Sequence, residues 1–433
     1  MTIDRLAGVM KSIVADFGAS ATKLPTKVRR ITTGSTMFDV RLGGGLPVGW
    51  VSEFWGDKSS GKSTSAIRTA GIAQRLCRHC RRPAKDWEPQ EPAEEGGRWP
   101  ATGHCDCVAS GVVPIESVLP QRITHANGKE ESMTAWAKRK AEVAERFKAN
   151  SFDEYVVVYC DPENAFDVEW AVTLGARPES FVFLRPVTAE EAVDQLGAIC
   201  DSTFADLLIV DSLAHFTPSK EIEESAFDWQ RGLAARLVNK GVRKWVAGAV
   251  KTARAGADEG HWGLTQIWIN QTRMKIGVTH GDPSVKPGGM GQDFAARYEV
   301  RFRGSYINKD TDMLEVKYGG KDDVFNIPIR EQINFAIVKG PTMKKAKGSY
   351  VHALRDGDPE KGETNKTGDV LEAADLFKTV NFWGMVEKVP KGYEFAGVTY
   401  KTQTALKNAL VSDPEIHEAV RQVIFERVVR GRG

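Results

Sequence analysis

A glycine-rich turn between an apolar segment and a helix constrains this chain more than any other feature. Residues 56–63 read GDKSSGKS and match the pattern G-x-x-x-x-G-K-[ST]. The turn follows the apolar segment 51–55, and we expect a helix to begin near Lys62. Between a strand and a helix, such a turn surrounds phosphate oxygens with backbone N–H groups and adds the positive end of the helix dipole. The sequence therefore predicts a nucleotide-binding α/β unit.

The side chains of this turn indicate a nucleotide bound with a metal ion. Lys62 adds positive charge near the β- and γ-phosphates, and the Ser63 hydroxyl is a ligand for Mg²⁺. The other candidate nucleotide-binding residues of the segment are Gly56, Ser59, Ser60, Gly61 and Thr64. The alternative, a glycine turn that only packs, is disfavoured by the flanking strand and helix.

Three further apolar runs end in polar residues, at 155–161, 207–211 and 265–271. Short apolar runs separated by helical stretches are typical of buried parallel strands. Ligands bind at the carboxyl ends of such strands. Asp211 is therefore placed to hold the water shell of Mg²⁺, and Glu163 is placed to take a proton from an attacking water. In isolation, Asp211 would equally cap a helix and Glu163 would be a surface glutamate.

Composition limits the class of protein. The chain has 433 residues, 41% hydrophobic and 27% charged, with a net charge of +2. This is typical of a globular protein of two to four domains, at roughly 100–200 residues each. No run reaches the roughly 18–20 apolar residues that span a bilayer, and the N-terminus lacks a signal-peptide pattern. We therefore expect a cytoplasmic protein without a membrane partner. The near-neutral charge neither requires nor excludes nucleic acid.

The chain divides by composition. Residues 1–30 read as an amphipathic helix followed by a basic linker. Residues 31–354 carry the α/β pattern, interrupted by a Cys-, Pro- and Trp-rich insertion at 77–150. After a polar boundary at 355–368, residues 369–433 read as a small C-terminal domain.

Four cysteines of the insertion are paired in sequence, as Cys77-x-x-Cys80 and Cys105-x-Cys107. Two close thiolate pairs can supply the four corners of a tetrahedral zinc site, and a metal would stabilise a segment too polar to form its own core. We therefore predict structural Zn²⁺. Thiols without metal, a redox pair, or a site that uses His79 or His104 remain alternatives. Cys160 and Cys200 are expected to be buried.

Several segments occur in the order found in the RecA family of homologous-recombination ATPases. They are ITTGS at 31–35, GDKSSGKST at 56–64, DPENAFD at 161–167, VDS at 210–212, GLAAR at 232–236, Arg243 and INQTRMKIG at 269–277. RMKIG after an INQ strand is not a general feature of nucleotide-binding proteins. The chain resembles this family over nearly all of 1–76 and 151–433, and we interpret it as a divergent, phage-type member.

The resemblance implies roles for the candidate residues. It implies that Lys62, Ser63 and Asp211 bind MgATP and that Glu163 activates water. Asp167 and Trp170 match positions that contact adenine, with the Trp ring in place of a stacking aromatic. These last two complete the nucleotide-binding set.

The resemblance also implies DNA binding. Gln271 matches the residue that senses the γ-phosphate and passes the signal to a DNA-binding loop at 272–289. A further DNA loop matches 221–232. We expect both loops to lie along the axis of a helical filament.

The residues of these loops agree with this assignment. The stretch 272–277 combines two cations with an apolar residue, and glycines allow the backbone to approach a strand. Two arginines seven residues apart on a predicted helix share a face and are candidates for phosphate contacts, with structural ion pairs as the alternative. The candidate DNA-binding residues are Arg231, Arg236, Arg243, Arg273, Lys275, Ile276, Gly288 and Gly289. A solvated charged loop is the alternative for 272–289.

Departures from the family pattern concern the DNA loops and the subunit interface. Arg231 stands where the family usually has Met. The family uses lysines of the neighbouring subunit to stabilise charge on the γ-phosphate, and Lys339 matches one of them. Two other lysine positions hold Pro341 and Asp293, whereas Phe294 matches an interface aromatic. Candidates to compensate, or else to bind DNA phosphate, are Lys344, Lys345 and Lys347.

The sequence thus predicts an α/β fold. It has a RecA-like P-loop ATPase core with a mostly parallel sheet, an N-terminal oligomerisation helix, a Cys-rich insertion and a small α/β C-terminal domain. The expected cofactors are ATP, Mg²⁺ and structural Zn²⁺. The expected partners are single-stranded DNA, homologous double-stranded DNA, other copies of the chain in a filament, and mediator proteins. Two alternatives are a hexameric DNA helicase or branch-migration motor with the same core, and a regulatory filament protein that does not hydrolyse ATP.

Overall fold

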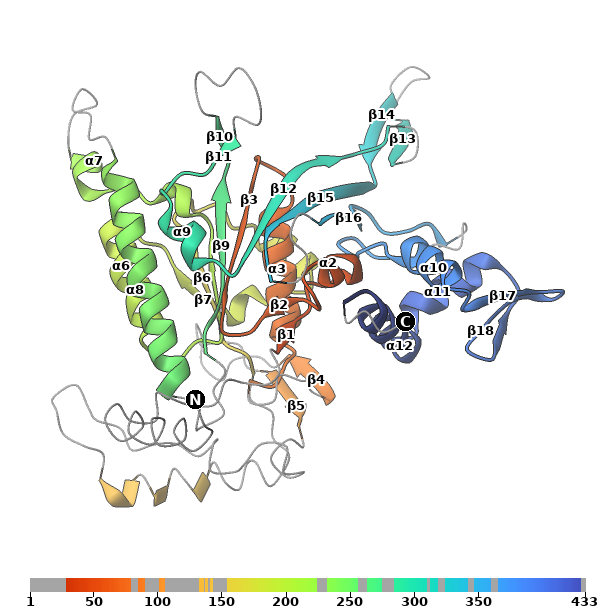
Figure 1. Cartoon of the computed structure of the whole chain (residues 1–433), viewed down its shortest axis with the longest axis horizontal. Helices are drawn as coiled ribbons and strands as arrows, with labels where there is room; N and C mark the ends of the chain where they lie inside the picture. Colours follow the sequence, from red (N-terminus) through yellow and green to blue (C-terminus); the bar gives the residue numbers. More distant parts are fainter. Residues whose placement is uncertain are drawn as a thin grey trace, which may run out of the picture.

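The computed structural model describes residues 29–78, 85–89, 101–105, 132–135, 137–138, 141–142, 154–223, 232–255, 263–274, 284–309, 312–317, 324–341, 346–359 and 365–429. Its centre is an eight-stranded sheet with helices on both faces (Figure 1). This confirms the predicted α/β class. No helix of the described residues is long and apolar enough to cross a membrane.

The strands of the central sheet follow the order β16-β15-β12-β3-β9-β8-β6-β7. The six strands from β12 to β7 run parallel, β15 is antiparallel to its neighbour β12, and β16 is antiparallel to β15. The bounds are β3 Val51–Gly56, β6 Val157–Cys160, β7 Val182–Leu184, β8 Leu207–Val210, β9 Thr265–Gln271, β12 Tyr298–Tyr306, β15 Arg330–Lys339 and β16 Lys347–Ala353. Each apolar run that the sequence suggested as a strand is therefore a neighbour of another one in the sheet.

Two apolar cores lie on the two faces of this sheet. Helices α3 (Lys62–Ala73) and α5 (Val168–Thr173) contribute to one core, and α6 (Ala189–Cys200) and α8 (Leu233–Ala255) to the other. Alternate residues of β6, β8 and β9 enter opposite cores, as the two-residue period of a strand requires. Cys160 and Cys200 are fully buried, as expected. Burial, reinforced by Asp201, raises the pKa of Cys200 to about 12, so this thiol is unreactive.

Shorter elements surround the sheet. They are β1 Arg30–Ile31, α2 Thr36–Arg41, β2 Leu46–Pro47, β4 Lys85–Pro89, β5 Ala101–His104, η3 Pro178–Ser180, η4 Leu213–His215, α7 Ser219–Glu223, β10 Arg273–Met274, β11 Ser284–Val285, α9 Gly291–Ala295, β13 Met313–Lys317 and β14 Val324–Pro328. Strands β4 and β5 form a sheet of their own, at the end of the molecule opposite to β10 and β11 (Figure 1). The expected N-terminal helix, Cys80 and Cys107 lie outside the described residues.

The C-terminal part has a separate apolar core. It consists of α10 Ala373–Phe382, β17 Val386–Val389, β18 Gly392–Phe395, β19 Val398–Tyr400, α11 Gln403–Ser412 and α12 Pro414–Val429. The segment 391–400 contains two strands of an antiparallel three-stranded sheet. Gly392 permits the close pairing of β18 with β19, because a Cβ at this position would lie 2.0 Å from the Tyr400 carbonyl oxygen.

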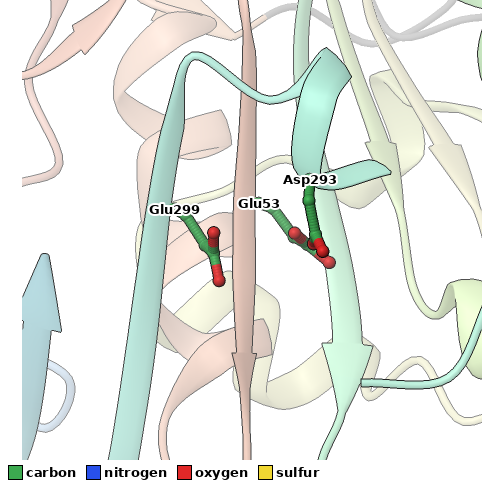
Figure 2. A group of neighbouring side chains, drawn as sticks. All are labelled: Glu53, Asp293 and Glu299. Atoms are coloured by element: carbon green, nitrogen blue, oxygen red, sulfur yellow. The ribbon is translucent and has the colours of Figure 1, made fainter. Parts of the chain in front are cut away.

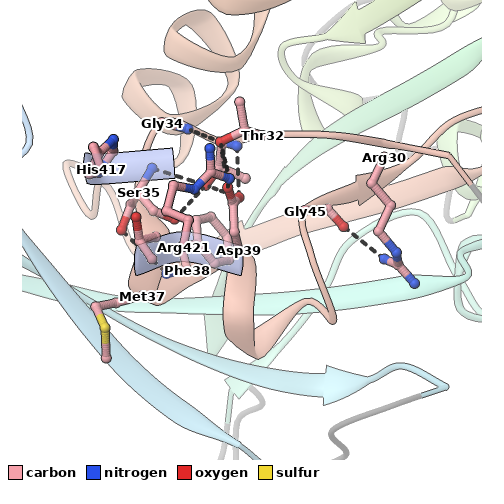
Figure 3. A network of polar contacts seen from close by, with 12 residues as sticks. Arg30, Thr32, Gly34, Ser35, Met37, Phe38, Asp39, Gly45, His417 and Arg421 are labelled. Atoms are coloured by element: carbon pink, nitrogen blue, oxygen red, sulfur yellow. Dashed lines mark hydrogen bonds and ion pairs between the residues drawn. The ribbon is translucent and has the colours of Figure 1, made fainter. Parts of the chain in front are cut away.

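A polar network links the C-terminal part to the core. Figure 3 shows its central contact, between Arg421 and Asp39. Asp39 is only 2% exposed. Its carboxylate accepts hydrogen bonds from the Thr33 backbone N–H (2.8 Å) and from the Thr32 hydroxyl, and Arg421 Nη2 lies 2.9 Å from Oδ2. Burial raises the pKa of Asp39, and the guanidinium of Arg421 offsets part of that rise.

We predict that Arg421→Ala lowers the free energy of unfolding by about 1–3 kcal/mol, because a buried carboxylate loses its cation. The raised pKa means that the folded chain holds the Asp39 proton more tightly than the unfolded chain. The contribution of Asp39 to stability therefore falls as pH rises through the window above its unfolded pKa. The variant should lose more stability at about pH 7 than at about pH 4 in urea unfolding.

The matched control is Lys378→Ala, which removes the exposed 3.7 Å pair with Asp375 on α10. That change should alter stability by less than about 1 kcal/mol. An equal loss in both variants would contradict the role of Arg421.

Candidate functional site

The predicted phosphate loop joins β3 to α3, and two glycines are sterically required in it. A Cβ on Gly56 would lie 2.0 Å from the Phe302 carbonyl oxygen of the neighbouring strand. A Cβ on Gly61 would lie 2.6 Å from Ile333 Cδ1, and its φ of 89° is left-handed. Ser59 also has a left-handed φ, 54°. The sheet therefore determines the course of the loop, and only glycine fits at its two ends.

Lys62 at the start of α3 points into the loop that precedes it. Its Nζ donates to the carbonyl oxygens of Gly56 at 3.1 Å and Asp57 at 2.5 Å, and lies 3.4 Å from Ser60 Oγ. Burial lowers the pKa of Lys62, and carboxylates near it offset part of this effect, namely those of Asp211, Asp57 and Glu163. The ammonium is thus enclosed by the loop that the pattern assigns to phosphate.

Asp211 and Ser63 lie together beside Lys62, as a Mg²⁺ site requires. Asp211 follows β8, and its carboxylate accepts hydrogen bonds from the Ser63 hydroxyl and from Tyr159 Oη, the latter at 2.7 Å. Burial raises the pKa of Asp211, and these two hydrogen bonds offset part of the rise. Oxygen donors of this kind suit Mg²⁺. Tyr159 was not predicted, because a tyrosine within an apolar strand reads as a core residue.

Glu163 lies at the junction of three strands of the sheet. Its Oε1 accepts hydrogen bonds from Gln271 Nε2 at the end of β9 (2.7 Å) and from Ser212 Oγ after β8 (3.1 Å), and it contacts His215 Nδ1. The structure thus brings together the two residues that sequence assigned to water activation and γ-phosphate sensing. His215 was not predicted, and its place four residues after Asp211 was the available signal.

The two candidate adenine residues lie on α5. Asp167 is the N-cap of this helix, and its Oδ1 accepts a hydrogen bond from the Trp170 backbone N–H at 2.8 Å. Trp170 Nε1 lies 3.4 Å from Thr64 Oγ1, and its ring packs edge-to-face against His352 at 5.8 Å. Asp167 therefore orients the turn that holds Trp170 beside the phosphate loop.

Of the candidate DNA-binding residues, the structure describes Arg236, Arg243, Arg273, Gly288 and Gly289, whereas Arg231, Lys275 and Ile276 lie outside the described residues. The three described arginines are exposed. Strands β10 and β11 pair at the base of the loop 272–289 and close it. The two glycines pack against α8, where a Cβ on Gly289 would lie 2.5 Å from Asn239 Nδ2.

Lys286, at the exit of this loop, enters a cluster of three carboxylates. Figure 2 shows that these come from β3 (Glu53), α9 (Asp293) and β12 (Glu299). Lys286 Nζ lies 2.6 Å from Glu53, 2.6 Å from Asp293 and 2.9 Å from Glu299. Burial alone would lower the pKa of Lys286, but Glu53 and hydrogen bonds to the other carboxylates raise it. Burial raises the pKa of Glu53, against the effect of Lys286.

Within the described part of the chain, these three carboxylates form the group whose spacing suits a metal ion. The ammonium of Lys286 occupies the position of a cation among them, so the group is an ion-pair cluster. Lys339, the candidate interface lysine, donates from Nζ to the Asp293 carbonyl oxygen at 2.5 Å. Phe294, the candidate interface aromatic, is 81% exposed.

Comparison with known proteins agrees with this geometry. The model of the RecA N-terminal domain matches residues 110–335, just over half of the chain. This chain belongs to the RecA family. The RecA protein of Streptococcus sanguinis (strain SK36) is 25% identical over 431 residues, which cover 96% of this chain and 83% of the relative. The RecA protein of Petrotoga mobilis (strain DSM 10674 / SJ95) is 29% identical over 249 residues, 52% of this chain and 65% of the relative.

The matches to RecA proteins cover both parts of the candidate site, the phosphate loop and the residues at the ends of the later strands. The segment matched by the RecA model contains Glu163, Asp211 and Gln271, and the phosphate loop lies before it in sequence. The sheet unites them, because Gly56 and Gln271 are partners in the pairing of β3 with β9. The RecA proteins of the streptococci align with both parts.

We predict that Lys286→Met lowers the free energy of unfolding by about 3–5 kcal/mol, because three clustered carboxylates lose their counter-ion. Asp293→Asn should be nearly neutral or stabilising, because it removes one negative charge from a cluster with negative excess. Urea unfolding of both variants measures the difference. A loss in Asp293→Asn as large as in Lys286→Met would contradict this account.

Proposed function

We propose that this protein is an ATP-dependent DNA recombinase. It forms helical filaments on single-stranded DNA and catalyses pairing and strand exchange with a homologous duplex. The observation that supports this most is the 2.7 Å hydrogen bond between Glu163 and Gln271. It joins the residue placed to activate water to the residue that begins the loop 272–289.

The arrangement of side chains supports hydrolysis of ATP. Lys62 neutralises charge on the β- and γ-phosphates, and Ser63 with Asp211 would hold Mg²⁺. When bound, Mg²⁺ supplies positive charge to the phosphate oxygens. Glu163 takes a proton from the attacking water. Gln271 turns from Glu163 towards the γ-phosphate.

Strand β9, which ends at Gln271, transmits the movement of this side chain to the DNA loop that follows it. The backbone N–H of Thr272, the first residue after β9, donates to the Gly56 carbonyl oxygen at 3.1 Å. The base of the DNA loop is thus hydrogen-bonded to the first residue of the phosphate loop. A movement of Gln271 on ATP binding therefore moves the loop that carries Arg273, so DNA affinity depends on the nucleotide.

We predict that Glu163→Gln suppresses ATP turnover by about 10²-fold or more, because the amide cannot accept a proton from water. ATP and DNA binding should be kept, because the two side chains have the same shape. Steady-state hydrolysis with and without single-stranded DNA measures turnover, and the parent should be stimulated several-fold by DNA. Fluorescence anisotropy measures binding. Hydrolysis by Glu163→Gln at the parent rate would refute the assignment of the base.

Electron microscopy with ATP and single-stranded DNA tests the assembly. Helical filaments support the recombinase, whereas closed rings support a hexameric helicase or branch-migration motor. Asp293 and Pro341, at positions where the RecA family uses interface lysines, favour a second candidate, a regulatory filament that hydrolyses ATP poorly. Filaments without DNA-stimulated turnover would support that candidate.

We also propose that Cys77, Cys80, Cys105 and Cys107 bind structural Zn²⁺ within the insertion 77–150. Cys77 and Cys105 are both buried, and Cys105 directly follows β5. Their burial is compatible with a site that closes the base of the insertion, and two thiolates on each side would complete a tetrahedron.

Metal analysis of the purified protein should find about one zinc per chain, and Cys105→Ser should lose it. Cys200→Ser is the matched control, because Cys200 is buried in α6 far along the chain from the insertion. Freshly reduced parent protein without zinc would contradict the site.

The remaining roles complete the proposal. The segment 1–30 docks on the neighbouring subunit, and Phe294 and Lys339 lie in that interface. Mediator proteins assist loading on DNA. The protein acts in the cytoplasm, associates with the nucleoid during repair and has a phage origin.

A further inference from the structure

His215 lies on the reacting side of the nucleotide site and has no role in the arrangement described above. It ends the one-turn helix η4, which begins three residues after β8. Its backbone N–H bonds to the Ser212 carbonyl oxygen at 3.2 Å, which folds the imidazole back towards the strand ends. Its side chain is 42% exposed and that of Glu163 is 24% exposed. Both side chains are therefore partly open to solvent.

The contacts determine which group donates. His215 Nδ1 contacts Glu163 Oε1, and a nitrogen without a proton would oppose its lone pair to the lone pairs of the carboxylate. Nδ1 therefore carries a proton and donates it to Glu163. Ser212 Oγ lies 3.1 Å from both Glu163 Oε1 and His215 Nδ1, and its single proton also goes to the carboxylate.

The two carboxylate oxygens of Glu163 therefore differ in their contacts. Among the described residues, every side-chain contact to this carboxylate falls on Oε1, from Gln271, Ser212 and His215. Oε2 is left to accept a proton from water. When Gln271 turns to the γ-phosphate, the two groups after β8 still hold Oε1.

We infer that His215 is a positioning residue for the general base Glu163. Its Nδ1–H holds Oε1 while Gln271 changes partner, so Oε2 stays directed at the attacking water. This inference rests on the proposed ATPase function. It deepens that function by assigning a group that maintains the base through the switch, because a carboxylate on an irregular loop would otherwise rotate.

The experiment compares His215→Ala with His215→Asn in the full-length protein with single-stranded DNA. His215→Ala should lower kcat for ATP about five- to twentyfold with an unchanged KM, because the base is misplaced while the phosphate contacts remain. The Asn side chain carries an N–H near the position of Nδ1, so His215→Asn should recover most of the lost turnover. Equal unfolding midpoints of both variants and the parent show that the fold is kept.

A double-mutant cycle with Glu163→Gln separates positioning from a general structural effect. If His215 acts only through Glu163, adding His215→Ala to Glu163→Gln should change the residual turnover by less than about twofold. A further five- to twentyfold loss in the double variant, or parent-like kcat in His215→Ala, would overturn the inference. Parent-like turnover of Glu163→Gln alone would instead overturn the base assignment on which it rests.

Discussion

The pairing of β3 with β9 is the constraint on which the rest of the site depends. Gly56 and Gln271 are opposite each other in this parallel pair, so the first residue of the predicted phosphate loop and the proposed sensor residue lie at one edge of the sheet. Parallel strands end at the same edge of the sheet, which brings Asp211 and Glu163 there as well. The close approach of Phe302 from β12 leaves room only for glycine at position 56.

In this arrangement, the proposed coupling between nucleotide and DNA would depend on backbone contacts. The hydrogen bond from Thr272 to Gly56 ties the start of the DNA loop to the phosphate loop. Lys286 ties the exit of the same loop to Glu53, three residues before Gly56 on β3. Both ends of the proposed DNA loop at 272–289 are therefore attached to the strand that leads into the predicted phosphate loop.

One departure from the RecA pattern, Asp293, takes part in the Lys286 cluster. Asp293, at a position where the family has a lysine, directs its carboxylate at Lys286 of the same chain. Lys339 donates to the backbone of Asp293. Lys339, which the resemblance assigned to the subunit interface, and Asp293, at an interface lysine position, thus also make contacts within one chain.

The sequence alone determined the class of fold, the strands β3, β6, β8 and β9, and the phosphate loop. Each of these is local, because apolar runs, glycine positions and the spacing of GKS are readable from neighbouring residues. Membership of the family followed from short segments in a fixed order. The candidate residues Glu163, Asp211 and Gln271 were also found in this way, since each lies at or just beyond the end of a recognisable strand.

Only the tertiary structure decided which side chains meet. Lys286 and its three carboxylates, Tyr159 behind Asp211, and His215 against Glu163 come from elements far apart in sequence or from positions that read as ordinary. Such contacts depend on strand register and on the order of strands in the sheet, because a side chain's partners lie on neighbouring strands. The sequence therefore specified the parts of the site, and packing of the sheet decided how they act on one another.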